Sequence, residues 1–220
     1  MQEVATNVHL GQIELNADVS VPDRAVGLVL FAHGSGSSRH SPRNRHVADV
    51  LHAGGIGTVL IDLLTEEEER IDEETAELRF DIPLLGRRLV GITDWIGRQP
   101  GLKHLGLGYF GASTGAAAAL VSAAERPDVV RAVVSRGGRP DLAGATLKGV
   151  LAPTLFIVGG RDEVVLGMNR SAIAELPRGT VHKLEIVPGA SHLFEESGTL
   201  DRVAKLATDW FHRHLAAKQG

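Results

Sequence analysis

The sequence has no cysteine, few aromatic residues and no long apolar run. Without cysteine the chain can form no disulfide framework, no thiolate metal site and no cysteine nucleophile. The longest apolar runs, such as residues 26–32 and 116–121, are far shorter than the ~20 residues that cross a bilayer, and an acid stands at Glu3, where a signal peptide has basic residues. We therefore expect a cytoplasmic protein with no membrane partner.

The charge balance is mildly acidic, with 23 basic and 27 acidic residues and a formal net charge of −4. Binding of nucleic acid along the phosphate backbone needs a basic face, so we expect no nucleic-acid partner. A chain of 220 residues that is 43% hydrophobic can bury one core, which predicts a single domain over residues 1–220. The 26 glycines indicate many tight turns or close backbone approaches.

Short apolar runs alternate with helical stretches along the chain. The predicted strands are residues 4–10, 13–21, 26–32, 58–63, 104–110, 129–135, 154–158 and 181–187; the predicted helices cover 43–53 and 81–98 and begin near residues 114, 165 and 199. The first two strands meet at Gly11-Gln12 as an antiparallel hairpin, and the later ones form βαβ units. The fold class is therefore α/β, a mostly parallel twisted sheet with an N-terminal antiparallel hairpin and helices on both faces.

Residues 65–77 contain eight acids and one arginine. Such a charged segment is typical of a solvated loop or an exposed helical turn. The alternative is a cap over a site at the strand ends, where reactive groups gather in parallel sheets.

A possible nucleophile follows the predicted strand 104–110, in the sequence Gly111-Ala112-Ser113-Thr114-Gly115. In G-x-S-x-G the serine occupies a sharp strand-to-helix turn, and small residues on both sides leave room for its strained backbone. The pattern predicts that Ser113 is a catalytic nucleophile.

A serine hydroxyl needs an imidazole to take its proton and a carboxylate to orient that imidazole. Asp162 and His192 follow two later predicted strands, in the required order of serine, acid and histidine. Asp162 has two competing interpretations, since it could instead cap the next helix or leave the role to Glu163. No pair of histidines has the spacing of a helical metal site, and we expect no metal and no cofactor.

An oxyanion hole completes such a site. One donor is expected to be the backbone N–H of Thr114, and the other that of Ser35 in the small-residue loop after the strand 26–32. We expect His33 to hold that loop by hydrogen bonds rather than to act in catalysis.

With these residues in place, the whole chain resembles a small α/β-hydrolase of the dienelactone-hydrolase-like group. The resemblance implies an α/β-hydrolase fold without a large lid, an elbow at Ser113, an acid at Asp162 and a base at His192. Dienelactone hydrolases proper use a cysteine nucleophile, which this chain lacks. Residues 135–141 also resemble family members that are joined to phosphoribosyltransferase domains.

Gly106 to Gly111 also spells G-x-G-x-x-G, the signature of a dinucleotide site. The context does not fit, because only residues 102–105 separate Gly106 from the breaker pair Pro100-Gly101, which is too short for a preceding strand, and no acid follows at the next strand end.

Several arginines lie near the predicted strand ends. If they face the site, they favour an anionic substrate; otherwise they pair with neighbouring acids. Arg136 is the candidate for a substrate contact, because it directly follows a predicted strand.

The sequence therefore predicts a serine hydrolase that cleaves a small-molecule carboxylic ester or lactone, including anionic ones, through an acyl-enzyme. An acyltransferase or perhydrolase with the same triad is the first alternative, and a non-catalytic or engineered scaffold is the second.

Overall fold

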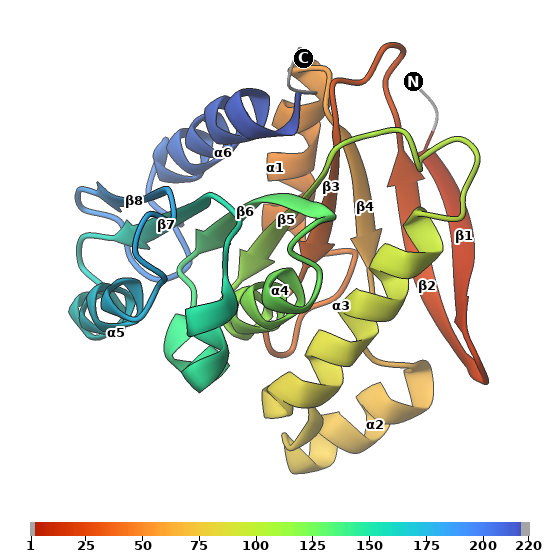
Figure 1. Ribbon diagram of the computed structural model, residues 1–220. Coiled ribbons are helices and arrows are strands. Elements are labelled where there is room, and N and C mark those ends of the chain that lie inside the picture. Colours follow the sequence, from red (N-terminus) through yellow and green to blue (C-terminus); the bar gives the residue numbers. More distant parts are fainter. Residues whose placement is uncertain (1–2, 217–220) are drawn as a thin grey trace.

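A computed structural model describes residues 3–216, and one eight-stranded sheet runs through them (Figure 1). The strands are β1 (Glu3–Leu10), β2 (Ile13–Ser20), β3 (Leu28–Ala32), β4 (Gly57–Ile61), β5 (Leu107–Ala112), β6 (Val130–Arg136), β7 (Thr154–Gly159) and β8 (His182–Val187). The helices are α1 (Pro42–Ala53), α2 (Glu66–Thr75), α3 (Ile82–Ile96), α4 (Thr114–Glu125), α5 (Glu163–Ala174) and α6 (Thr199–Leu215), with 3-10 segments η1 (Leu78–Phe80) and η2 (Pro140–Gly149).

The strand order is β1-β2-β4-β3-β5-β6-β7-β8. β1 pairs antiparallel with β2, and β2 pairs antiparallel with β4, while the remaining pairs are parallel. The predicted sheet with its N-terminal hairpin is thus confirmed. The carboxyl ends of the parallel strands, β3 to β8, meet along one edge, where the site must be sought.

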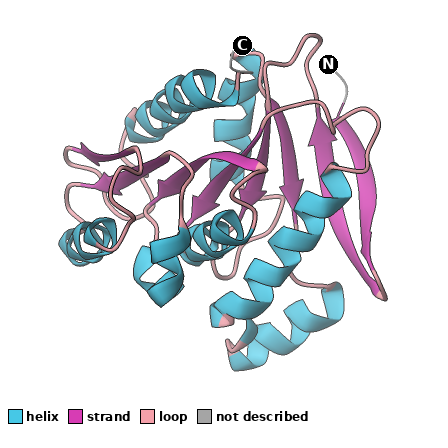
Figure 2. Cartoon of the chain, in the orientation of Figure 1, coloured by secondary structure: helices cyan, strands magenta, loops and turns pink. Residues whose placement is uncertain are grey.

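Helices cover both faces of the sheet, as the cyan and magenta layers of Figure 2 show. α1 and α6 lie on one face, where Phe31 and Phe110 belong to a core with Trp210 and Phe211 of α6. α3 and α4 lie on the other face, where Tyr109 packs among aliphatic side chains. Burial on both faces explains why β3, β4, β5 and β7 are mostly apolar along their whole length instead of alternating, whereas β8 at the sheet edge is polar and largely unburied.

Two segments differ from the sequence prediction. β5 begins at Leu107 and not at His104, because residues 99–105 form turns closed by bonds from Lys103 N–H to Gln99 O and from Leu105 N–H to Leu102 O. η2 was not predicted. It carries only a weak apolar pattern, with Ala143 and Leu147 buried against the α4 side.

The acidic segment forms a regular helix, α2, of ten residues. Thr65 starts it with a reciprocal capping box, in which its hydroxyl accepts the Glu68 N–H while the Glu68 carboxylate accepts the Thr65 N–H. Four glutamates in the first turn stabilise the positive end of the helix dipole. Within residues 3–216, no helix is long and apolar enough to cross a membrane.

Candidate active site

Ser113 occupies the sharp turn between β5 and α4. Its backbone has φ 50° and ψ −120°, a region that non-glycine residues rarely adopt. The flanking glycines make this turn possible: a Cβ on Gly115 would overlap the carbonyl oxygens of Ala32 and His33, and one on Gly111 would overlap the backbone of Ala116. The elbow that G-x-S-x-G predicts is therefore present, with the strain that functional turns often carry.

His192 and Asp162 lie together as predicted. The Nδ1 atom of His192 is 2.6 Å from Oδ2 of Asp162. Asp162 stands at the N-cap position of α5, yet its side chain makes no capping hydrogen bond. Asp162 therefore has the cap position that one interpretation gave it, but its carboxylate bonds to the imidazole and does not cap the helix.

The segment after β6 connects Ser113 with His192. The Ser113 N–H donates to Arg136 O at 3.2 Å, and Ser113 O accepts the Arg139 N–H at 3.0 Å. Between these two contacts, Gly137 faces the imidazole, since a Cβ there would lie 3.5 Å from Cε1 of His192. The elbow and the histidine therefore border the same four residues.

Ser35 and Thr114 form the expected pair beside the elbow. Their hydroxyl oxygens are 3.1 Å apart, although 79 positions separate them in sequence. No hydrogen bond within residues 3–216 occupies the backbone N–H of either residue. The two residues that the sequence predicts as oxyanion donors are therefore neighbours, and their backbone N–H groups have no hydrogen-bond partner among the described residues.

His33 holds the loop that carries Ser35. The Leu63 N–H donates to Nε2 of His33 at 3.0 Å, so the proton resides on Nδ1, which donates to Gly34 O at 3.0 Å. Burial lowers the pKa of His33 below its ordinary value. A neutral imidazole that is hydrogen-bonded through both ring nitrogens fits the structural role that the sequence predicts.

This arrangement of elbow, acid and histidine on an α/β sheet coincides with a family match. The model of the Dienelactone hydrolase family matches residues 84–216, which include Ser113, Asp162 and His192. The chain belongs to the dienelactone hydrolase family. It is therefore an α/β hydrolase, as its resemblance to this group implied.

Solved structures agree with the assignment. A dienelactone hydrolase from Anabaena variabilis is 59% identical, with a TM-score of 0.95 over 97% of this chain and 98% of that one. A serine hydrolase from Xanthomonas campestris, described as lacking a lid, is 19% identical with a TM-score of 0.73 over 99% of this chain and 97% of its own. The second likeness shows the fold alone, and it matches the lidless architecture.

Two curated relatives from Mycobacterium tuberculosis strains are named "Putative phosphoribosyl transferase". Each is 55% identical to this dienelactone hydrolase family member over 215 residues, which is 98% of the chain and 47% of the relative. The chain thus spans about half the length of the curated relatives it matches.

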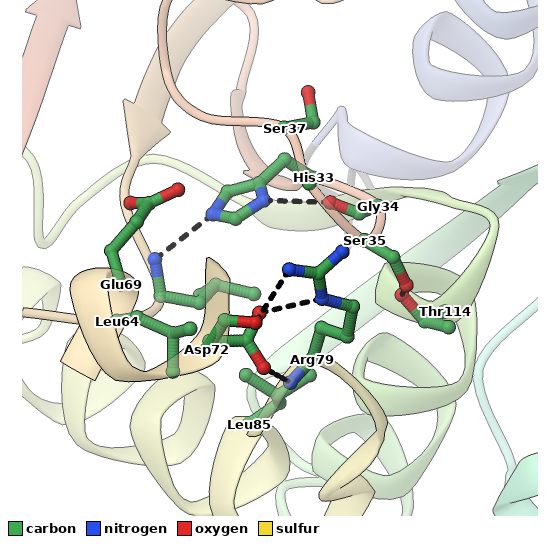
Figure 3. A pocket seen from close by; sticks show the side chains of 12 residues that line it. His33, Gly34, Ser35, Ser37, Leu64, Glu69, Asp72, Arg79, Leu85 and Thr114 are labelled. Carbon is green, nitrogen blue, oxygen red and sulfur yellow. Dashed lines mark hydrogen bonds and ion pairs between the residues drawn. The ribbon is translucent and has the colours of Figure 1, made fainter. Parts of the chain in front are cut away.

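In this dienelactone hydrolase family member, α2 helps to line a narrow recess beside Ser35 and Thr114 (Figure 3). Glu69 and Asp72 of α2 line it together with Arg79 of η1. Asp72 holds Arg79 in place through bonds of 2.8 Å to its N–H and 2.6 Å to Nε. α2 is otherwise largely exposed, as expected of a solvated charged segment, and the residues that line this recess do not include Ser113, Asp162 or His192. Arg79 had no signal in the sequence beyond its charge.

Glu196 is a second residue that the sequence analysis missed. Its carboxylate oxygens accept the Ser191 N–H at 3.0 and 3.1 Å, and Oε1 lies 3.3 Å from Nη1 of Arg161. The hydrogen bond from Ser191 holds the pKa of Glu196 below its usual range. Glu196 thereby joins the loop that carries His192 to the loop that carries Asp162.

The loop arginines separate into two groups. Five form an ion pair with an acid: Arg39 with Asp62, Arg43 with Glu195, Arg45 with Asp18, Arg139 with Asp141 and Arg161 with Glu196. Arg136 has no acidic partner in the described part of the chain, and its nearest polar contact is Oδ1 of Asn44 at 3.4 Å. Pairing with acids therefore accounts for these five, and Arg136 is the exception.

No group of three or more histidine, aspartate or glutamate side chains within residues 3–216 has an arrangement that could hold a metal ion.

Proposed function

We propose that the protein is a serine hydrolase that cleaves a carboxylic ester or lactone with Ser113, His192 and Asp162 as its triad. The observation that carries the proposal is the 2.6 Å contact between His192 Nδ1 and Asp162, beside a strained serine elbow. This contact favours the tautomer in which Nδ1–H donates to the Asp162 carboxylate, which leaves Nε2 free to accept the proton of the serine hydroxyl.

In the first half of the reaction, Oγ of Ser113 attacks the carbonyl carbon while Nε2 of His192 takes the hydroxyl proton. The oxyanion that forms accepts hydrogen bonds from the N–H groups of Ser35 and Thr114. The intermediate then collapses, the bond to the alcohol oxygen breaks, and His192 returns the proton to that oxygen. Removal of one such oxyanion donor typically costs about 10²–10³ in rate.

In the second half, water attacks the acyl-enzyme while His192 again takes a proton. The acid product leaves, and Ser113 recovers its proton. For a lactone the alcohol remains tethered to the acyl group, so a single product is released. The absence of cysteine from the chain leaves serine as the nucleophile at the elbow.

We assign this hydrolysis, and not phosphoribosyl transfer, to the chain. Ser113, Asp162 and His192 all lie in this chain, within its match to the family model, and the chain spans only 47% of the relatives that carry the transferase name.

The proposal is tested by mass spectrometry of the protein mixed with a slowly deacylating aryl ester. We expect a covalent acyl adduct on Ser113 that disappears as water resolves it. Methanol or hydrogen peroxide added during turnover would reveal by product partition whether either replaces water, the outcome expected of an acyltransferase or perhydrolase. A folded protein that forms no adduct would behave as a non-catalytic scaffold and would contradict the proposal.

A further inference from the structure

β8 is an edge of the sheet that nothing in the described part of the chain covers. It ends the strand order and lies at the outer end of the sheet in Figure 1, and β7 is the one described strand that pairs with it. Just before β8, Val181 O accepts the Thr154 N–H of β7 at 2.9 Å. Main-chain groups alternate in direction along a strand, so the N–H and C=O groups of His182, Leu184 and Ile186 point outward, away from β7.

The side chains of β8 leave this edge accessible. Val181 and Ile186 are 53% and 36% exposed, although both are apolar. Ile186 points to the same face as Leu184, which packs against the core on the α3 side. An edge strand with unpaired main-chain groups and exposed apolar side chains is a template for pairing with another chain. The occupant that fits this edge is therefore another strand.

Lys183 and Glu185 indicate which strand that is. They lie on one face of β8, where Nζ of Lys183 is 2.5 Å from Oε1 of Glu185. A second copy of β8 in the antiparallel direction presents the same two charges in the opposite order, so each lysine can lie across from the other copy's glutamate. Opposite charges directly across an antiparallel pair stabilise it, and like charges destabilise it. The edge is therefore complementary to itself.

The same charges select one register. Pairing centred on Leu184 keeps the outward groups bonded and sets Lys183 opposite Glu185 twice. Pairing centred on Glu185 sets that glutamate opposite its own copy and places Pro188, which has no N–H to donate, at a hydrogen-bonding position opposite His182. Pairing centred on Lys183 sets two lysines face to face. Among the registers that overlap most of β8, the one centred on Leu184 alone avoids a like-charge pair.

We propose that two copies of this chain associate through antiparallel pairing of their β8 strands, centred on Leu184. The contact is isologous, about a two-fold axis, and it joins two eight-stranded sheets into one continuous sheet. Leu184 pairs with Leu184, and His182 pairs with Ile186 on both sides of the axis, which provides about six main-chain hydrogen bonds. The inference is independent of the proposed hydrolase function, and its tests measure association instead of activity.

The register is tested with single cysteines, because the chain contains none of its own. In the proposed register the two Leu184 Cα atoms lie about 5.5 Å apart, within the range of a disulfide, and the two Lys183 Cα atoms lie about 8 Å apart, beyond it. With oxidised glutathione we expect a covalent dimer of Leu184→Cys and none of Lys183→Cys alone. A mixture of Lys183→Cys and Glu185→Cys should form the mixed dimer. Asn7→Cys, at an exposed position of the opposite edge strand β1, is the control and should stay monomeric.

Charge reversal tests the pairing without a cross-link. Sedimentation equilibrium should show a dimer of the wild-type chain, and Glu185→Lys should raise its Kd by about tenfold or more, because lysine then faces lysine at two positions. The double variant Lys183→Glu, Glu185→Lys restores opposite charges and should recover the dimer. Glu125→Lys makes the same change at an exposed position of α4 and should leave the Kd unchanged.

Two results would overturn the proposal. One is a folded wild-type chain that stays monomeric while Leu184→Cys does not cross-link. The other is a dimer that Glu185→Lys does not weaken, or one that cross-links through Asn7→Cys instead. If Leu184→Cys does not fold, a mixture of His182→Cys and Ile186→Cys examines the same register at more exposed positions. A mixed dimer then supports the proposal, and its absence contradicts it.

Discussion

Nδ1 of His192 lies 2.6 Å from Oδ2 of Asp162, across two loops that follow the neighbouring parallel strands β7 and β8. The loops meet this closely because β7 ends in glycine: a Cβ on Gly159 would lie 2.5 Å from the carbonyl oxygens of Ala190 and Ser191. The Arg161 N–H also donates to Ala190 O at 3.0 Å. Contacts between backbone atoms of the two loops therefore hold the Asp162 carboxylate close to the His192 imidazole.

Asp162→Asn should lower kcat by about 10³–10⁴-fold, because an amide that donates to Nδ1 stabilises the wrong tautomer of His192. Steady-state hydrolysis of a chromogenic ester measures the effect. Glu163→Gln is the matched control, since Glu163 is exposed and adjacent, and it should leave kcat unchanged. An equal loss in both variants would contradict the assignment of Asp162 as the acid.

Glu196→Ala should lower kcat by about tenfold with little change in KM, because the turn that carries His192 loses its contacts to Ser191 and Arg161. Glu196→Gln should retain most of the activity, since an amide oxygen still accepts the Ser191 N–H. Kinetics and the Tm of both variants separate positioning from folding. If Glu196→Gln lowers kcat as much as Glu196→Ala, the hydrogen bond from Ser191 does not position His192.

Gly115→Ala should destabilise the fold by about 3 kcal/mol or more. The added methyl would overlap the carbonyl oxygens at the end of β3, which are backbone atoms that cannot rotate away. Gly167→Ala, in α5 with no atom near the new methyl, should instead stabilise by about 0.5–1 kcal/mol through helix propensity. Urea unfolding measures the change in the free energy of unfolding for each variant. A Gly115→Ala protein as stable as the wild type would refute the close packing of the elbow on β3.

Because His33 is buried, we expect the free energy of unfolding to fall in mild acid. Its pKa is lowered by burial in the folded protein, so in the unfolded chain it takes up a proton near pH 6.5 while the folded protein does not. Its stabilising contribution is complete above that pH and is lost as the pH falls through the folded pKa. His52 and His214, whose pKa values burial also lowers, act in the same direction.

The measurement for His33 is the free energy of unfolding in urea between pH 5 and pH 8, compared with that of His33→Gln. The variant loses stability at every pH through its broken loop contacts, so the slope against pH is the quantity that matters. We expect a shallower slope in the variant, by up to about 1.4 kcal/mol per pH unit. An unchanged slope would mean that His33 is not held neutral.

The sequence could predict the parallel sheet and the places of Ser113, Asp162 and His192 after three strands, because each depends on local signals. Apolar runs bounded by glycine and proline indicated the strands. The G-x-S-x-G pattern indicated the elbow, because its two glycines leave room for backbone atoms that any Cβ would overlap. Asp162 and His192 followed from their positions after two strands, and the structure joins them at 2.6 Å.

The remaining features depend on contacts between distant segments. Glu196 gains its role only because the turn at Ser191 folds back on it, and Arg79 reaches the recess only because Asp72 holds it. Arg136 differs from the other arginines near the strand ends in its burial and its lack of an acidic neighbour, which no local pattern encodes. Charge alone could suggest all of these residues but could not rank them.

The most direct test of the central claim, that Ser113 is an activated nucleophile, is labelling with a fluorophosphonate followed by peptide mass spectrometry. A serine reacts rapidly with this probe when a base and an oxyanion hole activate it. We predict one adduct on the wild-type protein, at Ser113, and none on Ser113→Ala. A folded wild-type protein that stays unlabelled, or that is labelled at another serine such as Ser35, would contradict the account.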